Sequence, residues 1–314
     1  MWKMKRTIFI ILIFLMSSVC VAQEWFTSFD VAKRLATVQN KMLFVLWEGS
    51  FDYEFPVILF NKKGKGEIVD LRTNDTINQM IWEYFVPVKL PEYEYAEFSK
   101  QVKETRGLTY YSKLIDDGIK IMDINGNILN IDDSDDKVYF ADDYPYLIIN
   151  EFIKRYALNT SLLKLELDSY SNEKSFATAF RLASKYVDYS IFVRQDLRAK
   201  IIDLADIYYD DAKRFLTEND ENYVAFLQKL DLEHIKELLI LGNPRKARRL
   251  LKKMDTIPID EINQRLFDFL NFTTFKLLED EENATLWENK LSPLDLKKAE
   301  LILNINSSIH GKSN

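Results

Sequence analysis

The sequence predicts an α/β domain followed by an all-α domain, and three observations support this prediction. The run MLFVLW at residues 42–47 is uniformly apolar, as in a strand that is buried on both faces of a partly parallel sheet. Residues 119–131 place apolar runs on both sides of Asn125-Gly126, which is typical of a β-hairpin. From residue 159 onward the strand patterns stop and helical periodicity begins.

The first 22 residues have the pattern of a secretory signal peptide. Three basic residues precede the apolar stretch 8–16, and a small-x-small sequence ends at Ala22. We expect cleavage between Ala22 and Gln23, which leaves a periplasmic or secreted chain without stable membrane insertion, because the apolar stretch is too short to span a bilayer comfortably. An uncleaved anchor is one alternative.

A lipoprotein acylated at Cys20 is a second alternative, and it fits less well. Lipoprotein signals carry a small residue directly before the cysteine and usually leucine three positions before it, whereas Val19 and Ser17 stand there. Cys20 is the only cysteine of the chain, so a chain that begins at Gln23 has neither a thiol nor a disulfide.

Charge and histidine content exclude several function classes. Removal of residues 1–22 leaves 39 basic against 49 acidic residues, a poor balance for binding nucleic acid. His234 and His310 are the only histidines, which leaves little material for histidine metal sites or a Ser-His-Asp triad. We expect no catalytic, cofactor-binding or metal-binding residue of a known motif.

The α/β domain is expected over residues 23–158 and begins with a helix. Residues 28–40 have apolar residues at helical spacing, with Thr27 or Ser28 as the N-cap and Asp30 in the first turn. The strand 42–47 follows almost directly.

The next stretch, residues 56–71, is harder to assign. Two apolar runs flank NKKGKG at 61–66, which looks like an exposed hairpin tip. A helix over 74–85, capped by Asn74 or Asp75, leads into a strand over 86–90, where Pro87 favours an edge or strand-end position because it lacks an N–H.

The hairpin and a final helix complete this domain. Asn125-Gly126 predicts a type I′ turn, which needs positive φ at both central residues. Residues 147–156 then place Ile148, Phe152 and Tyr156 on one face of a helix.

Four segments resemble, in their order, a thioredoxin-like domain of the branch found in exported bacterial proteins. These segments are FDVAKRLATVQNK, MLFVLW, NDTINQMIWEYFVPVKLP and IKIMDINGNIL. The resemblance covers residues 25–157 and depends on order and pattern. Another small α/β sandwich is the alternative.

The redox motif of that family is absent. The resemblance places the family's Cys-x-x-Cys at Ser50, Phe51, Asp52 and Tyr53, and its cis-proline in the loop 116–118, which contains no proline. Thiol–disulfide exchange needs a thiolate, so the resemblance implies a redox-inactive domain.

The second domain, residues 159–308, is predicted to be helical, with a flexible tail at 309–314. Ala177, Ala212 and Ala247 are spaced by 35 residues, and the stretch LLILGNPRKARRLLKKM resembles a tetratricopeptide-type helical hairpin. An irregular helical bundle is the alternative. The clearest helical segments are 192–207, 223–241, 259–278 and 293–305.

Three clusters have both a functional and a structural interpretation. The aspartates at 132–136 and 142–143 suggest calcium, but their spacing does not fit an EF-hand loop and favours a solvated acidic loop. The basic run 245–253 suggests an acidic partner or an anionic lipid surface, or a solvated helix face with residues 247, 250, 251 and 254 turned inward. Five aromatic residues suggest a peptide groove or packing at the rim of the domain: Tyr93, Tyr95, Phe98, Tyr110 and Tyr111.

We therefore expect an exported, non-enzymatic protein that binds another envelope protein or a peptide. Two alternatives remain open at this point. The chain positions or chaperones clients for a separate thiol–disulfide oxidoreductase, or it is an enzyme that uses carboxylates on an unrecognised fold.

Overall fold

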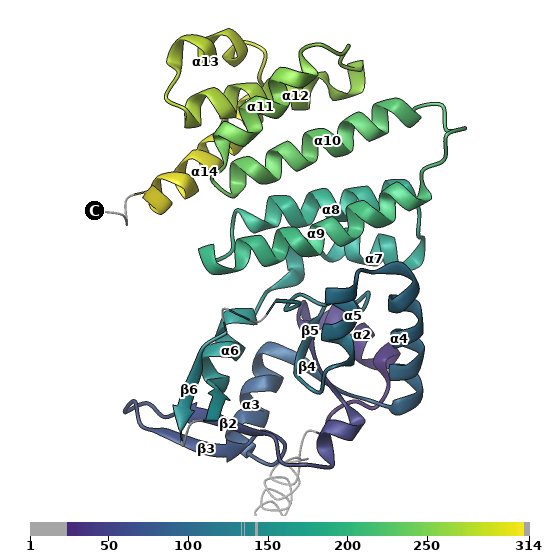
Figure 1. The fold of residues 1–314 in the computed structure, drawn as a ribbon, viewed down its shortest axis with the longest axis vertical. Coiled ribbons are helices and arrows are strands. Elements are labelled where there is room, and N and C mark those ends of the chain that lie inside the picture. Colours follow the sequence, from purple (N-terminus) through teal and green to yellow (C-terminus); the bar gives the residue numbers. More distant parts are fainter. Residues whose placement is uncertain (1–23, 133, 135, 142–143, 311–314) are drawn as a thin grey trace, which may run out of the picture.

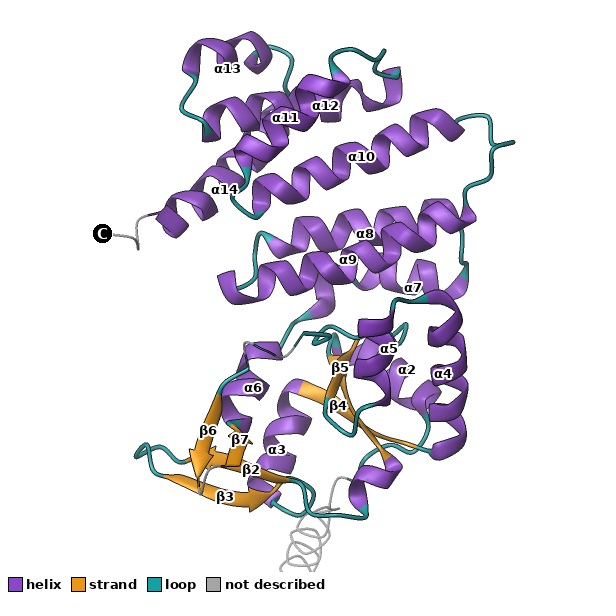
Figure 2. Ribbon diagram, viewed as in Figure 1, coloured by secondary structure: helices purple, strands orange, loops and turns teal. Residues whose placement is uncertain are grey.

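The computed structural model describes residues 24–132, 134, 136–141 and 144–310. A mixed α/β part is followed by a part that is helical throughout, and the two stack end to end (Figures 1 and 2). The predicted signal peptide, Cys20 and the cleavage site Ala22–Gln23 lie outside the described residues.

A three-stranded sheet forms the centre of the α/β part, with β1 (Met42–Trp47) in the middle. On one side β1 pairs in parallel with β4 (Phe85–Leu90), and on the other it pairs antiparallel with β5 (Lys120–Met122). Leu43 and Phe44, which point to opposite faces, both have an exposed fraction of 0%. The prediction of a strand buried on both faces is therefore confirmed.

Two helices with predicted caps flank this sheet. In α2 (Phe29–Gln39) the side chain of Ser28 accepts a hydrogen bond from a backbone N–H of the first turn, and Asn74 does the same for α3 (Asp75–Tyr84). Pro87 lies in the outer strand β4, where its carbonyl accepts from the Phe26 N–H at 3.1 Å. The edge position predicted for Pro87 is confirmed.

Two further hairpins form small sheets beside the central one. The segment that was difficult to assign folds as β2 (Pro56–Phe60) and β3 (Gly66–Asp70), with the lysine-rich tip between them. The pair β6 (Val138–Ala141) and β7 (Tyr144–Leu147) was not predicted. A bridge between Ile58 and Ile148 places β7 beside β2, so the two hairpins lie next to each other.

The turn at Asn125-Gly126 differs from the predicted type I′ turn. The Asp123 carbonyl accepts from the Gly126 N–H at 3.0 Å, and only Gly126 has a positive φ, at 83°. The turn therefore centres on residues 124 and 125, one position earlier than predicted. The Asp123 carboxylate explains the shift, because it accepts from the N–H groups of Asn125 and Asn127 at 2.9 and 3.1 Å.

The second arm of this hairpin is also shorter than predicted. It pairs with β5 only through a bridge between Met122 and Ile128. Beyond that bridge, the side chain of Asn130 accepts from the Ile121 N–H at 2.7 Å and donates to the Ile119 carbonyl at 2.9 Å. A side-chain amide thus replaces the strand ladder there.

Three helices complete the α/β part: α4 (Glu92–Thr105), α5 (Leu108–Ile115) and α6 (Ile149–Tyr156). Of these only α6 was predicted, and its Phe152 and Tyr156 are buried as expected. No residue of α4 is fully buried, which explains its weak sequence signal.

The rest of the described chain is helical, as predicted. After the short η2 (Thr160–Leu162), the helices are α7 (Lys164–Asn172), α8 (Phe176–Ser190), α9 (Gln195–Phe215), α10 (Tyr223–Ile240), α11 (Pro244–Met254), α12 (Glu261–Leu277), α13 (Glu281–Glu288) and α14 (Pro293–His310). The last helix includes residues 309 and 310, which were assigned to the tail. Figure 1 shows α7–α9 against the α/β part and α10–α14 farther away.

The three alanines of the predicted 35-residue repeat do not occupy equivalent positions. Ala177 is exposed in the first turn of α8, Ala212 is buried near the end of α9, and Ala247 is buried near the start of α11. The helices also differ in length, at 15 residues in α8, 21 in α9 and 11 in α11. Alanine suits any close helix contact, so its spacing alone does not set a structural period.

A buried carboxylate joins the two parts. Besides the two backbone N–H groups of its own turn, Asp123 accepts hydrogen bonds from the hydroxyls of Tyr186 on α8, at 3.2 Å, and Tyr208 on α9. Its exposed fraction is 0%, and this burial raises the pKa of Asp123, while the hydrogen bonds oppose the rise.

A second contact lies beside it. Arg106, from the end of α4, forms a bidentate pair with Asp211 of α9 at 2.9 and 3.0 Å. Tyr170 of α7 donates to the same carboxylate at 2.7 Å. One hydrophobic cluster continues from the central sheet into α8 and α9, so the two parts share a core.

We predict that Asp123→Ala destabilises the whole chain by about 3–5 kcal/mol, because two backbone N–H groups and two tyrosine hydroxyls lose their acceptor in a buried site. Denaturant unfolding followed by tryptophan fluorescence measures this change. Asp231→Ala, at an exposed position on α10, is the matched control and should stay within about 0.5 kcal/mol of the wild type. Equal stabilities of the two variants would contradict the prediction.

Candidate functional site

The candidate site lies where the central strand β1 ends. A 3₁₀ turn, η1 (Glu48–Phe51), follows Trp47 directly. A β-carbon on Gly49 would lie 2.4 Å from the Trp47 ring, so only glycine allows the chain to fold back over this indole. The indole stacks on Tyr95 of α4, with ring centroids 5.4 Å apart, and donates to Glu92 at 2.7 Å.

Ser50 faces the loop that precedes β5. Its exposed fraction is 7%, and its hydroxyl donates to the Asp117 carbonyl at 3.1 Å. Ser50 makes no hydrogen bond to a histidine, a lysine or a carboxylate within the described residues.

A pocket of about 360 Å³ opens in front of Ser50. Tyr53, with an exposed fraction of 79%, stands at its rim. The lining is mixed and contains Trp47, Gly49, Ser50, Asp52, Tyr53, Glu54, Phe55 and Asp117. Of the four predicted positions, the structure places Ser50, Asp52 and Tyr53 at this pocket, whereas Phe51 packs against Trp25 at a centroid distance of 5.3 Å.

A second, more apolar pocket lies beside the first. It measures about 340 Å³ and shares Phe55 with its neighbour. The loop that precedes β5 contributes to both pockets. Asp117 lines the first pocket, and Gly118 and Ile119 line the second. The unpredicted β6–β7 hairpin supplies one wall, with Val138, Pro145 and Leu147. These two neighbouring pockets are together called the β1-end groove below.

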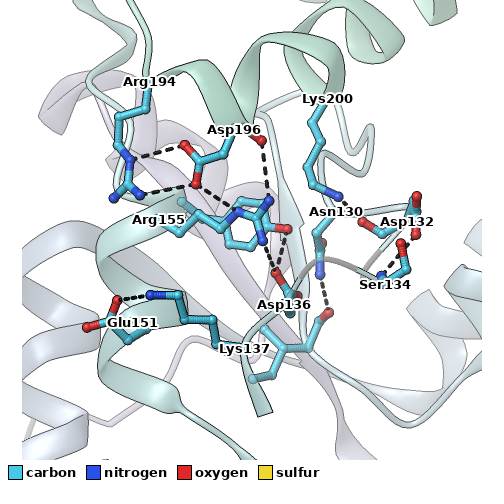
Figure 3. A network of polar contacts seen from close by, with 12 residues as sticks. Asn130, Asp132, Ser134, Asp136, Lys137, Glu151, Arg155, Arg194, Asp196 and Lys200 are labelled. Atoms are coloured by element: carbon cyan, nitrogen blue, oxygen red, sulfur yellow. Dashed lines mark hydrogen bonds and ion pairs between the residues drawn. The ribbon is translucent and has the colours of Figure 1, made fainter. Parts of the chain in front are cut away.

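A network of ion pairs holds the wall of this groove (Figure 3). Arg155 of α6 pairs with Asp136 at 3.0 Å and with Asp196 of α9 at 3.5 Å. Lys200 of α9 donates to the Asp132 carbonyl. The loop that leads to β6 is thus fixed to α6 and to the helical part.

This network corrects the prediction of a fully solvated acidic loop. The side chain of Asp136 is 7% exposed and also accepts from the Tyr156 hydroxyl at 3.0 Å. Asp132 is exposed, and hydrogen bonds from Ser134 lower its pKa. The aspartates 133, 135, 142 and 143 lie outside the described residues. In the part of the chain that is described, no group of three or more acidic, histidine or cysteine side chains is arranged to hold a metal ion.

The five aromatic residues do not line one groove. Tyr95 covers Trp47, Phe98 packs on Phe29 at a centroid distance of 4.9 Å, and the Tyr110 hydroxyl accepts from the Ile128 N–H at 2.9 Å. Tyr93 is exposed and Tyr111 is half-buried. The interpretation of these residues as packing groups holds for Tyr95, Phe98 and Tyr110.

A titratable cluster that the sequence did not indicate lies where α9 and α10 pack. Glu237 of α10 is 2% exposed; one carboxylate oxygen contacts His234 at 3.0 Å, and the other has no hydrogen-bond partner among the described residues. Burial, and then the negative charge of Glu237, raises the pKa of the half-buried Asp206 of α9 to about 7. The hydrogen bond to Glu237 raises the pKa of His234. His234 and Glu237 lie three residues apart on α10, whereas only the fold brings Asp206 to them.

Comparison with protein-family models, curated proteins and solved structures finds no match. None of the helices described, residues 24–310 with their short gaps, is long and apolar enough to cross a bilayer.

We predict that the contact between α9 and α10 weakens as the pH rises. The pKa of Asp206, about 7, lies above its unfolded value of 3.8, so the free energy of unfolding falls as the pH rises between these two values, where the carboxyl is ionised in the unfolded chain but still protonated in the folded one. The raised pKa of His234 acts in the same direction, because its contribution is lost once the ring deprotonates. Asp206→Asn should therefore be more stable than the wild type at about pH 8, by about 1 kcal/mol. Its free energy of unfolding should also fall less than that of the wild type between about pH 5.5 and about pH 8.

Thermal unfolding across this pH range measures the effect. Asp231→Asn, at an exposed position on α10, is the control and should follow the wild type. The same pH dependence in Asp206→Asn and in the wild type would contradict the assignment.

Proposed function

We propose that this chain is an exported protein-binding protein whose α/β part is a thioredoxin-like domain without redox thiols, and that its β1-end groove holds an extended peptide segment of the partner. The observation that carries the proposal is the contact of Ser50 with the Asp117 carbonyl. This contact brings the end of β1 against the loop before β5, the two places where the resemblance locates the dithiol and the loop opposite it.

The order and direction of the strands support the domain assignment. A central strand with a parallel neighbour on one side and an antiparallel hairpin strand on the other suits a thioredoxin-like sheet. The helices α2 and α3 precede the two parallel strands, as the family's order requires. The proposal of export depends on the pattern of residues 1–22 alone.

The chemistry of the groove supports binding rather than catalysis. Residues 24–314 contain no cysteine, so no thiolate is available for disulfide exchange. The groove offers exposed aromatic and apolar surface at Tyr53, Val138 and Pro145, together with the acidic Asp52 and Glu54. Such a mixture suits an extended peptide with apolar side chains and some positive charge.

We predict that a benzophenone amino acid at position 53 yields discrete covalent adducts with one partner when cells that produce the protein are irradiated. Leu286 on α13 is the matched control, since it is 67% exposed against 79% for Tyr53 and lies far from the groove. The adducts should form at position 53 and not at position 286. Absence of adducts at position 53, or the same adducts at both positions, would contradict the proposal.

An activity assay separates binding from redox chemistry. The purified protein from Gln23 onward should not accelerate the reduction of insulin by dithiothreitol, because it has no thiol to exchange. Acceleration that a single side-chain change in the groove abolishes would overturn the proposed function.

A further inference from the structure

The helix α11 presents a cationic strip on the surface of the helical part. Ala247, Leu251 and Met254 turn inward, and α11 packs against α10 and α12 (Figure 1). This confirms the predicted inward face. The outward face carries six cations within nine positions, called the α11 strip below: Arg245, Lys246, Arg248, Arg249, Lys252 and Lys253.

The cations of the α11 strip have no acidic partner within the described residues. None of the six forms an ion pair there, whereas cations such as Arg106, Arg155 and Arg265 each pair with an aspartate. Arg248 is half-buried over the ring of Phe275, 4.6 Å from its centroid, and the other five are exposed. The strip is thus an uncompensated positive patch on a chain that has more acidic than basic residues.

Part of this arrangement is unfavourable for the isolated protein, although Lys252 and Lys253 in the last turn suit the helix dipole. Arg245, Arg249 and Lys252 follow each other at spacings of four and three, so like charges are neighbours on one helix face. Arg245 and Lys246 also lie in the first turn, near the positive end of the helix dipole, and that turn has no acidic residue. A bound anionic partner would remove both penalties.

The surroundings of the strip select the kind of partner. A single helix is only about 10–12 Å wide, and the chain directly after α11 carries the exposed acids Asp255, Asp260 and Glu261. A flat anionic lipid surface is broader than one helix, so the negative charges that directly follow α11 in the chain oppose its approach. A slender ligand can lie along the strip and avoid them.

We propose that the α11 strip binds an acidic segment of another protein, a helix or extended stretch rich in Asp and Glu. The strip is distinct from the β1-end groove and lies at the other end of the molecule (Figure 1), so this proposal does not depend on the proposed function. Association would be steered by charge and would weaken with salt.

The test measures binding of a fluorescent Glu-rich peptide, about as long as α11, to the purified protein by anisotropy. The same peptide with Gln in place of Glu is the matched ligand. The Glu peptide should bind at low salt and lose affinity as the salt concentration rises, and the Gln peptide should not bind. Equal binding of the two peptides, or none by either, would overturn the proposal.

Two triple variants locate the site. Arg245→Gln/Arg249→Gln/Lys252→Gln removes three charges from the strip, and Lys62→Gln/Lys63→Gln/Lys65→Gln removes three exposed charges from the tip of the β2–β3 hairpin. The first variant should weaken binding of the Glu peptide by about tenfold or more. The second should weaken it by about twofold at most, because salt screens exposed charges that are far from the bound peptide. Equal weakening by both variants would show a net-charge effect and would overturn the proposal.

Two further measurements address misfolding and lipid binding. The α11 variant should unfold at a temperature equal to or above that of the wild type, since it loses like-charge repulsion, so reduced binding is not misfolding. Vesicles of phosphatidylglycerol and of phosphatidylcholine test the lipid alternative. Tighter binding to phosphatidylglycerol vesicles than to the peptide, lost in the α11 variant, would overturn the proposed protein partner.

Discussion

The buried carboxylate of Asp123 sets the geometry on which the rest of the molecule depends. A fully buried carboxylate is unfavourable unless its oxygens are satisfied, and here two backbone N–H groups and two tyrosine hydroxyls satisfy them. The N–H groups belong to the α/β part, whereas the hydroxyls belong to α8 and α9. One side chain therefore shapes the turn after β5 and fixes that turn to the helical part.

Contacts between the two parts also reach one wall of the groove. The turn at Asp123 follows β5, and the loop 117–119 at the other end of this three-residue strand lines both pockets. The wall opposite depends on α9 as well, through the contacts of Arg155 with Asp196 and of Lys200 with the loop before β6. The residues that line the two pockets all belong to the α/β part, and the helical part supports one wall from behind.

Local sequence signals predicted the elements that form by local rules. The run at 42–47 and the caps Ser28 and Asn74 gave the central strand and two flanking helices almost to the residue. Ser50 and Tyr53 were placed at the groove because chain order alone puts them after the central strand.

Features that depend on distant partners were not predictable. The turn at Asp123 shifted because its carboxylate competes for backbone donors, and Asp206 meets Glu237 only through the packing of α9 on α10. The alanine spacing failed because close helix contacts recur without a fixed period.

Hydrogen exchange at the amides of Asn125 and Asn127 tests most directly whether the two parts form one cooperative unit around Asp123. Both amides donate to its carboxylate in a turn without regular secondary structure. If the junction is as stable as the core, these amides exchange only on global unfolding, at the same free energy as the amides of α8 and α9. Exchange of the two amides at a much lower free energy, while α8 and α9 stay protected, would show that the turn opens independently and would contradict the central role of Asp123.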